Sequence, residues 1–213
     1  MLAIDGPAGA GKSTVARLVA EHLGVAFLDT GAMFRAVAIT ALARGVDPAD
    51  GDGVEEVAAS IAIDVDDGRT LVDGTDVTDA IRTPEANRTV SVVATHAAVR
   101  EILRHRQREW MADRGAGVVE GRDISTVVFP DACLKVFLTA SADERARRRV
   151  RQSGGDVAEI GAQIAERDRI DSTRRVAPLA VAPDSVVIDT TGRTAEDVVA
   201  EIAAMFEDRC GSG

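Results

Sequence analysis

The stretch IDGPAGAGKST, residues 4–14, decides the fold of this chain. It contains the pattern GxxxxGK[ST], with Lys12 and Ser13 at its end. The apolar run LAI (2–4) comes directly before it and predicts a buried strand. The following segment, KSTVARLVAEHLG (12–24), has apolar residues at helical spacing and ends at a glycine. A strand, a glycine-rich loop and a helix in this order predict a phosphate-binding loop.

Backbone N–H groups in such a loop point at a phosphate, and the helix N-terminus adds partial positive charge. We expect Lys12 to reach the β- and γ-phosphates of ATP and the Ser13 hydroxyl to bind Mg²⁺. The chain has two lysines against 23 arginines, so a lysine at this position is informative. The residues expected to bind ATP are Gly6, Pro7, Ala8, Gly9, Ala10, Gly11, Lys12, Ser13 and Thr14.

Further strands are expected at 25–29, 117–123, 134–140 and 185–192, separated by helical patterns. We expect Thr30 to cap a helix that runs to about Arg44, a helix to start at Ser141, and helical segments at 84–113 and 194–208. This order predicts an α/β fold with a parallel sheet flanked by helices. Residues 61–83 alternate in polarity and contain Asp-Gly at 67–68 and 73–74, which predicts a small antiparallel insertion.

Composition limits the class of protein. With 46% hydrophobic and 28% charged residues and no run of 18 apolar residues, the chain reads as a cytoplasmic globular protein without a membrane span. Cys133 and Cys210 have no CxxC or histidine spacing, which argues against a disulfide framework or a zinc site. The net charge of −10 disfavours nucleic acid as a partner. Arginine is nevertheless clustered at 104–108, 145–151 and 167–175, which fits a small anionic ligand.

Other motifs in the sequence distinguish between a GTPase, a motor ATPase and a kinase. A GTPase would show Asn-Lys-x-Asp, which is absent, and a motor ATPase would show an apolar strand ending in two acidic residues. The nearest stretch here, GVVEGRD (117–123), has the single Glu120 followed by glycine. Arginines spread over several segments instead favour a kinase of a small anionic acceptor, because they can spread the charge of a moving phosphoryl group.

Four stretches together resemble one family from end to end: IDGPAGAGKST, LDTGAMFR, EGRDISTVVFPDA and ERDRIDSTRRVAPL. They are similar to the bacterial cytidylate kinases, the (d)CMP kinases among the nucleoside monophosphate kinases. The resemblance implies one P-loop kinase domain over 1–213, a monophosphate-binding region at about 30–100 with its insertion at about 61–83, and a short lid at about 148–162. It also implies ATP with Mg²⁺ as cofactor, CMP or dCMP as acceptor, and transfer to CDP or dCDP.

The resemblance further implies roles for individual residues. Thr30 would contact CMP, Arg35 and Arg122 its phosphate, and Arg167 and Asp171 its ribose. Cytosine would be read by Ser91, Arg100 and Asp123; a carboxylate suits the N4 amino donor of cytosine and repels O4 of uracil. Arg174 would contact phosphate, so that Lys12, Arg122 and Arg174 are the expected catalytic residues. Phe34 stands where relatives often have tyrosine.

The spacing of Arg167, Asp171 and Arg174, i, i+4 and i+7, predicts that they share one helix face. The acceptor phosphate is mostly dianionic at neutral pH, so no general base is required. Two alternatives stay open: a P-loop kinase of UMP, AMP or shikimate, and a nucleotide-binding regulatory factor that has lost transfer. We expect a monomer.

Overall fold

The computed structural model describes residues 1–66 and 68–210 and divides the chain into two compact units. The first unit combines two stretches that are far apart in sequence, Met1–Phe27 and Ala116–Gly213, and the second is the single stretch Leu28–Gly115. The region expected at 30–100 falls inside the second unit, and that it binds the acceptor stays a prediction. The expected lid at 148–162 falls inside the first unit.

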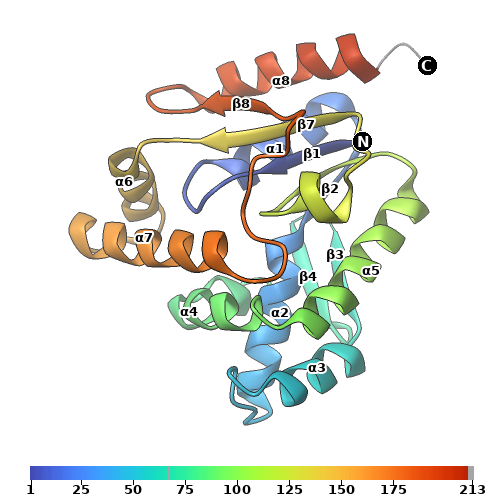
Figure 1. Ribbon diagram of the computed structural model, residues 1–213, viewed down its shortest axis with the longest axis vertical. Helices are drawn as coiled ribbons and strands as arrows, with labels where there is room; N and C mark the ends of the chain where they lie inside the picture. The colour runs from blue at the N-terminus through green and yellow to red at the C-terminus, as the bar shows by residue number, and fades with distance from the viewer. Residues whose placement is uncertain (67, 211–213) are drawn as a thin grey trace. The chain divides into compact units, whose positions relative to one another are not determined.

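The first unit carries a parallel β-sheet whose central strand is the first strand of the chain. Strand β1 pairs in parallel with β6 and β7, and β7 pairs in parallel with β8. The sheet order is β2-β6-β1-β7-β8, formed by β2 (Ala26–Asp29), β6 (Gly117–Glu120), β1 (Leu2–Asp5), β7 (Leu134–Thr139) and β8 (Val186–Asp189). Figure 1 shows β1, β7 and β8 side by side. The parallel sheet expected from the sequence is thereby confirmed.

The helices of this unit are α1 (Lys12–Leu23), α6 (Ala142–Ser153), α7 (Val157–Thr173) and α8 (Ala195–Cys210), with one π-helical turn, η2 (Ile124–Val128). Helix α1 ends at Gly24, which has the left-handed φ of 63° that a glycine cap favours. Helix α6 begins after Ser141, whose hydroxyl accepts the N–H of Glu144. Both ends agree with the sequence prediction.

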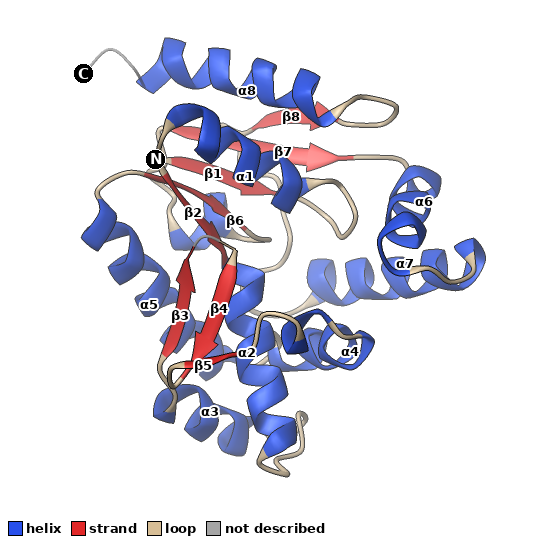
Figure 2. Cartoon of the chain, turned by 180° about the vertical axis from the view of Figure 1, so that it is seen from behind, coloured by secondary structure: helices blue, strands red, loops and turns tan. Residues whose placement is uncertain are grey.

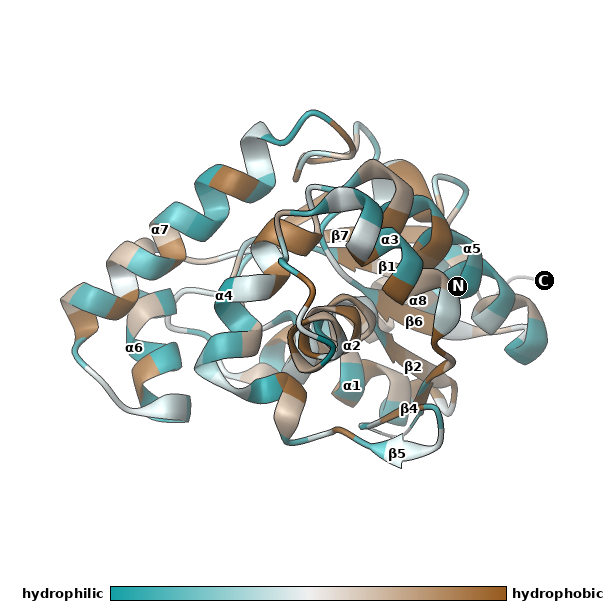
Figure 3. Ribbon diagram, turned by 90° about the horizontal axis from the view of Figure 1, so that it is seen from below, coloured by the Kyte–Doolittle hydropathy of each residue, from teal (hydrophilic) through white to brown (hydrophobic). Residues whose placement is uncertain are grey.

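The core of the first unit lies between the sheet and helices α1 and α8. Figure 2 shows these two helices beside β1, β7 and β8. Leu2, Ile4 and Leu138 of the strands and Val19 and Ile202 of the helices are fully buried. The strands β1, β6 and β7 are mainly hydrophobic in Figure 3, as expected for strands with neighbours on both sides. This apolar layer holds the carboxyl end of β1, and with it the phosphate loop, in a fixed position.

The second unit contains α2 (Thr30–Ala43), α3 (Gly51–Ser60), α4 (Pro84–Val93), α5 (Ala97–Arg114), the 3₁₀ turn η1 (Ala80–Arg82) and strands β3 (Ile63–Asp66), β4 (Arg69–Val72) and β5 (Thr75–Asp76). The three strands form an antiparallel sheet in the order β3-β4-β5, as predicted. Asp73 and Gly74 both have positive φ, 49° and 78°, which is the backbone that Asp-Gly favours in a tight hairpin. The other predicted turn includes Asp67, which lies outside the described residues.

One expectation for the helices of the second unit needs correction. Asp29 caps helix α2, because its carboxylate accepts the N–H of Ala32, and Thr30 is already the first helical residue. The helical segments expected at 84–113 are confirmed as α4 and α5, and His96 between them is the N-cap of α5. The indole N–H of Trp110 on α5 donates to the Val65 carbonyl at 3.1 Å and ties this helix to the small sheet.

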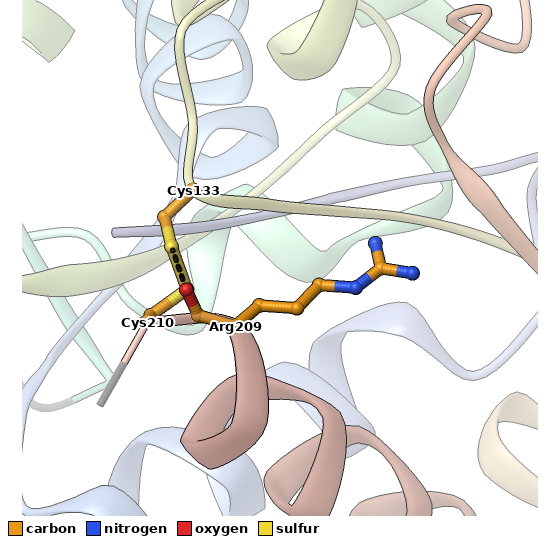
Figure 4. The surroundings of a disulfide bond; sticks show 3 residues. All are labelled: Cys133, Arg209 and Cys210. Atoms are coloured by element: carbon orange, nitrogen blue, oxygen red, sulfur yellow. Dashed lines mark hydrogen bonds between the residues drawn. A yellow bond between two sulfur atoms is a disulfide. The ribbon is translucent and has the colours of Figure 1, made fainter. Parts of the chain in front are cut away.

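The cysteines are joined, which the sequence did not predict. Cys133 and Cys210 form a disulfide with an S–S distance of 2.00 Å, although 77 positions separate them (Figure 4). Helix α8 packs against β7, and this brings its last residue next to the segment that leads into that strand. The absence of a short Cys spacing therefore did not exclude a disulfide, because tertiary packing brings the two cysteines together.

Across the described residues, no helix combines the length and apolar character that crossing a bilayer requires.

Candidate active site

The phosphate loop leaves β1 through a glycine that no other residue can replace without displacing backbone. Gly6 has φ 148°, and a Cβ there would lie 2.1 Å from the carbonyl oxygen of Leu138. The loop ends at Gly11, whose left-handed φ of 90° starts α1 at Lys12. The loop therefore passes close to β7 and leads directly into the N-terminus of α1, a position in a fold that favours an anion such as phosphate.

Helices α6 and α7 hold the loop through its backbone. The N–H of Ala8 donates to the Asp168 carboxylate at 3.2 Å, and the Ala8 carbonyl accepts from Arg145 at 3.0 Å. Arg145 and Asp168 also form an ion pair with each other. Further along the loop, the Ala10 carbonyl accepts from the Thr190 hydroxyl at 3.1 Å and from Arg148 at 3.4 Å.

These contacts separate the arginines of the 145–151 cluster. Arg145 and Arg148 turn toward the phosphate loop, whereas Arg147 and Arg151 are largely exposed and pair with Asp143 and Glu144 on their own helix. The sequence singled out the cluster but did not distinguish its members.

Lys12 is almost fully buried, and its ammonium donates to the Pro7 carbonyl at 2.9 Å. Burial, reinforced by the positive charge of Arg122, lowers the pKa of Lys12 to about 7, and Glu120 opposes this shift only in part. The loop is thus built with a cation that its surroundings do not fully neutralise. An anionic phosphate is the partner that would restore its charge.

Ser13 and Glu120 form the oxygen pair next to the loop. The Ser13 hydroxyl donates to the Glu120 carboxylate at 2.5 Å, and Glu120 is buried at the end of β6. Mg²⁺ is normally bound by one or two protein oxygens together with substrate phosphates, so this pair fits the ion. In the described part of the chain there is no group of three or more His, Cys, Asp or Glu side chains that could hold a metal by themselves.

Three arginines surround the carboxylate of Asp171, which is buried on α7. Arg122 donates to it at 2.9 Å, Arg174 lies 3.6 Å away and Arg167 3.9 Å away. Burial alone would raise the pKa of Asp171, but the three arginines outweigh it and hold the pKa below its ordinary value. Four expected site residues therefore lie together in the first unit.

Arg174 reaches this cluster by a route that the spacing did not predict. Helix α7 ends at Thr173, and Arg174 has the extended angles φ −61° and ψ 143°, so it does not share a helix face with Arg167 and Asp171. Its backbone turn brings the guanidinium back to Asp171 and also to Asp123, 3.4 Å away. The proximity was predicted correctly, but the helical reason for it was wrong.

In the second unit, α2 positions Thr30, Phe34 and Arg35. Thr30 is buried, and Arg35 pairs with the carboxylate of Asp29 at 2.7 Å. The Nε of Arg35 is buried without a hydrogen-bond partner. A buried donor of this kind is costly unless a ligand accepts from it, which suits an anion-binding role.

Ser91 and Arg100 are contributed by α4 and α5, and both are buried. Arg100 donates to the Ala94 carbonyl at 3.2 Å, and its guanidinium lies over the Phe34 ring, 5.3 Å from the centroid. Phe34 therefore holds Arg100 through its ring face, a contact that needs no phenolic hydroxyl. The aromatic ring at this position has a role without the tyrosine oxygen.

A family model described as cytidylate kinase matches residues 2–208. The chain belongs to the cytidylate kinase family. The resemblance seen in the four sequence stretches is confirmed.

A cytidylate kinase from Pelotomaculum thermopropionicum is 49% identical over 95% of this chain and 94% of its own length. A bifunctional pantoate ligase/cytidylate kinase from Synechococcus is 48% identical over 98% of this chain and 45% of its own length. The chain thus spans about half the length of the bifunctional relatives that it matches. The solved structure of a gluconokinase from Sinorhizobium meliloti aligns with a TM-score of 0.53 at 16% identity, over 95% of this chain and 89% of that one, which shows a shared fold.

Within this family fold, sequence reasoning missed two residues that the structure ties to the phosphate loop, Asp168 and Thr190, and gave no role to Glu120, which accepts from Ser13. Asp168 follows Arg167 directly in the late motif and could have been found from that adjacency. From the sequence, Glu120 was noted only as a single acidic residue at the end of its strand, where a motor ATPase would have two. Thr190 lies 180 positions from the loop carbonyl that it contacts, and no sequence pattern predicts that contact.

Proposed function

We propose that this chain is an ATP-dependent cytidylate kinase that transfers the γ-phosphoryl group of Mg·ATP to CMP or dCMP. Membership of the family supports the reaction class. The single observation that carries the proposal is the gathering of Arg122, Arg167 and Arg174 around the buried carboxylate of Asp171. Three guanidinium groups on one carboxylate carry an excess of positive charge, and an anion with several oxygens is the ligand that such a site favours.

The residues of the first unit can lower the barrier to transfer without a general base. The moving phosphoryl group spreads negative charge over its oxygens, and preorganised cations stabilise that charge. We assign this role to Lys12, Arg122 and Arg174. Although burial acts against it, the carboxylates of Asp171 and Glu120 raise the pKa of Arg122, so that arginine stays charged throughout.

Mg²⁺ is proposed as the cofactor, held by the Ser13 hydroxyl with Glu120 beside it. When bound, it would neutralise charge on the β- and γ-phosphates. The protein's own contribution is to present the serine oxygen at the start of α1 and to fix it through its hydrogen bond to Glu120.

Recognition of cytosine is assigned to Asp123, with Ser91 and Arg100. Asp123 is buried, and a buried carboxylate accepts the N4 amino group of cytosine but repels O4 of uracil. The ribose is assigned to Arg167 and Asp171. Thr30 and Arg35 are assigned to the acceptor phosphate side, where the buried Nε of Arg35 supplies a donor.

The remaining proposals concern context. The partners are the nucleotides ATP, CMP and dCMP, without nucleic acid or membrane, and the chain acts as a monomer in the cytoplasm. The net charge of −10 supports the exclusion of long polyanions. In a reducing cytoplasm, Cys133 and Cys210 would be held as thiols rather than as the disulfide.

The test is ADP release from Mg·ATP with CMP, dCMP, UMP, AMP or shikimate as separate acceptors, for wild type and Asp123→Asn. Asparagine keeps an acceptor oxygen for Arg174 but loses the charge that favours the cytosine amino group. The matched control is Asp143→Asn, since the Asp143 side chain is 81% exposed on α6.

We expect turnover with CMP and dCMP well above UMP, and a preference for CMP over UMP that falls about tenfold or more in Asp123→Asn but not in the control. Turnover that prefers AMP or shikimate would exclude the cytosine assignment. Binding of CMP with negligible ADP release from any acceptor would favour a regulatory factor instead.

A further inference from the structure

Asp5 is a buried carboxylate that the proposed chemistry does not use. It is the last residue of β1, directly before the phosphate loop, and its side chain is almost completely removed from solvent. Burial raises the pKa of Asp5, although hydrogen bonds from the Ser125 and Ile124 backbone oppose the shift. Burying a carboxylate is energetically unfavourable unless hydrogen-bond donors compensate for the lost solvation.

Its partners are two backbone N–H groups on a distant segment. Ile124 donates to Asp5 Oδ1 at 2.8 Å and Ser125 to Oδ2 at 2.7 Å, across about 120 positions of sequence. These residues open the π-helical turn η2, and N–H groups at the start of a helix have no acceptor within it. Asp5 therefore caps η2 from another strand, while the N-cap residue, Asp123, makes no side-chain cap bond.

The residues between these contacts are the ones assigned to the acceptor. Just before them, the Gly121 N–H donates to the Ile4 carbonyl at 2.9 Å. Just after them, Ile124 and Ser125 are fixed by Asp5. Arg122 and Asp123 are thus held at both ends by two consecutive residues of β1.

We propose that Asp5 is a positioning residue that fixes Arg122 and Asp123 relative to the phosphate loop. Its backbone leads into the loop that binds the donor, and its side chain sets the segment that binds the acceptor. A change at Asp5 shifts acceptor recognition first, because the loop keeps its own hydrogen bonds at Ala8 and Ala10. The inference rests on the proposed function in that Arg122 and Asp123 contact CMP.

The test is Asp5→Asn. The amide oxygen can accept one N–H, but the NH₂ group then faces the other, so one hydrogen bond is lost and the segment must move. We expect the KM for CMP to rise about tenfold or more, the preference for CMP over UMP to fall, and the KM for ATP to stay within about threefold, because small displacements of binding groups are costly.

The control is Ile202→Val on α8. This change loosens the apolar core of the first unit at a position far in sequence from Arg122 and Asp123. It should lower thermal stability and leave both KM values unchanged. Equal rises in both KM values for Asp5→Asn, or an unchanged KM for CMP, would overturn the proposal.

A second measurement needs no variant. Amide hydrogen exchange of the wild type without nucleotide should show Ile124 and Ser125 protected, and exchange there as fast as at an exposed loop would also overturn the proposal. If wild type fails to phosphorylate CMP at all, the proposed function fails, whereas the exchange result still reports on the anchor itself.

Discussion

Replacing Lys12 by methionine should stabilise the substrate-free protein while it abolishes phosphoryl transfer. Lys12 is 6% exposed, and the positive charges of Arg122 and Arg167 act on it together with burial. Methionine has a similar length and fills the same space without a charge. The variant removes an unfavourable buried cation, for which we propose a phosphate as the partner.

The size of the effect follows from the pKa of Lys12, which falls from 10.5 to about 7 in the folded protein. Between these values the unfolded chain binds the proton more tightly, so the lysine destabilises the fold fully below pH 7 and progressively less toward pH 10.5. At pH 7 this amounts to about 4 kcal/mol. The lost hydrogen bond to Pro7 offsets about 1 kcal/mol, which leaves a net gain of about 3 kcal/mol.

The assay is urea unfolding of both proteins, without nucleotide, at constant ionic strength from pH 6 to pH 10. The difference in unfolding free energy should be largest at pH 6 to 7 and shrink as the pH rises. Lys135→Met is the matched control, since Lys135 is the other lysine and pairs with Asp184 at 2.8 Å. That variant should be slightly less stable than wild type, because it loses an ion pair.

The reasoning is refuted if Lys12→Met is less stable than wild type at pH 7. It is refuted equally if the difference in stability is the same at pH 6 and pH 10, because a pH-independent effect cannot come from the protonation of Lys12.

Three further outcomes are expected. Binding of ATP should restore the proton on Lys12, so calorimetry in buffers of different ionisation enthalpy should find an uptake of about 0.5 proton at pH 7 and about 0.9 at pH 8; no uptake at either pH would contradict the lowered pKa. Gly6→Ala should cost at least about 3 kcal/mol of stability, measured by denaturant unfolding, because a Cβ meets the Leu138 carbonyl at a φ that alanine disfavours. The Cys133–Cys210 bond closes a loop of 77 positions and should add about 4.5 kcal/mol to the unfolding free energy of the oxidised protein. Dithiothreitol should remove that increment from wild type and change nothing in Cys133→Ser.

The sequence was sufficient for the features that local patterns encode. The phosphate loop and α1 follow from glycines, an apolar strand and a helical period, all within residues 2–24. The antiparallel hairpin at Asp73-Gly74 follows from turn chemistry, since both residues adopt positive φ. Asp123 and Asp171 were singled out through the family motif, and the structure adds that both are buried.

Features that depend on tertiary packing were not predictable. Asp5 lies in the quoted motif, yet its partners are amides 119 and 120 positions later, and no pattern in either segment points to the other. Arg174 was placed on a helix because its spacing fits one, but α7 stops before it. The disulfide was rejected on Cys spacing, a local criterion that cannot report on the docking of α8.

The sheet order has a consequence for how the chain is made. Strand β1 is synthesised before the other strands of its sheet, but both of its neighbours, β6 and β7, come from residues 117–139. Until the ribosome has added those residues, the earliest strand has no partner, and its apolar residues have no sheet to join. The stretch from Leu28 to Gly115 is contiguous and contains its own small sheet, so it can acquire structure during that interval. The phosphate loop is therefore translated before the strands that flank β1, and its surroundings are among the last parts of this unit that can be completed.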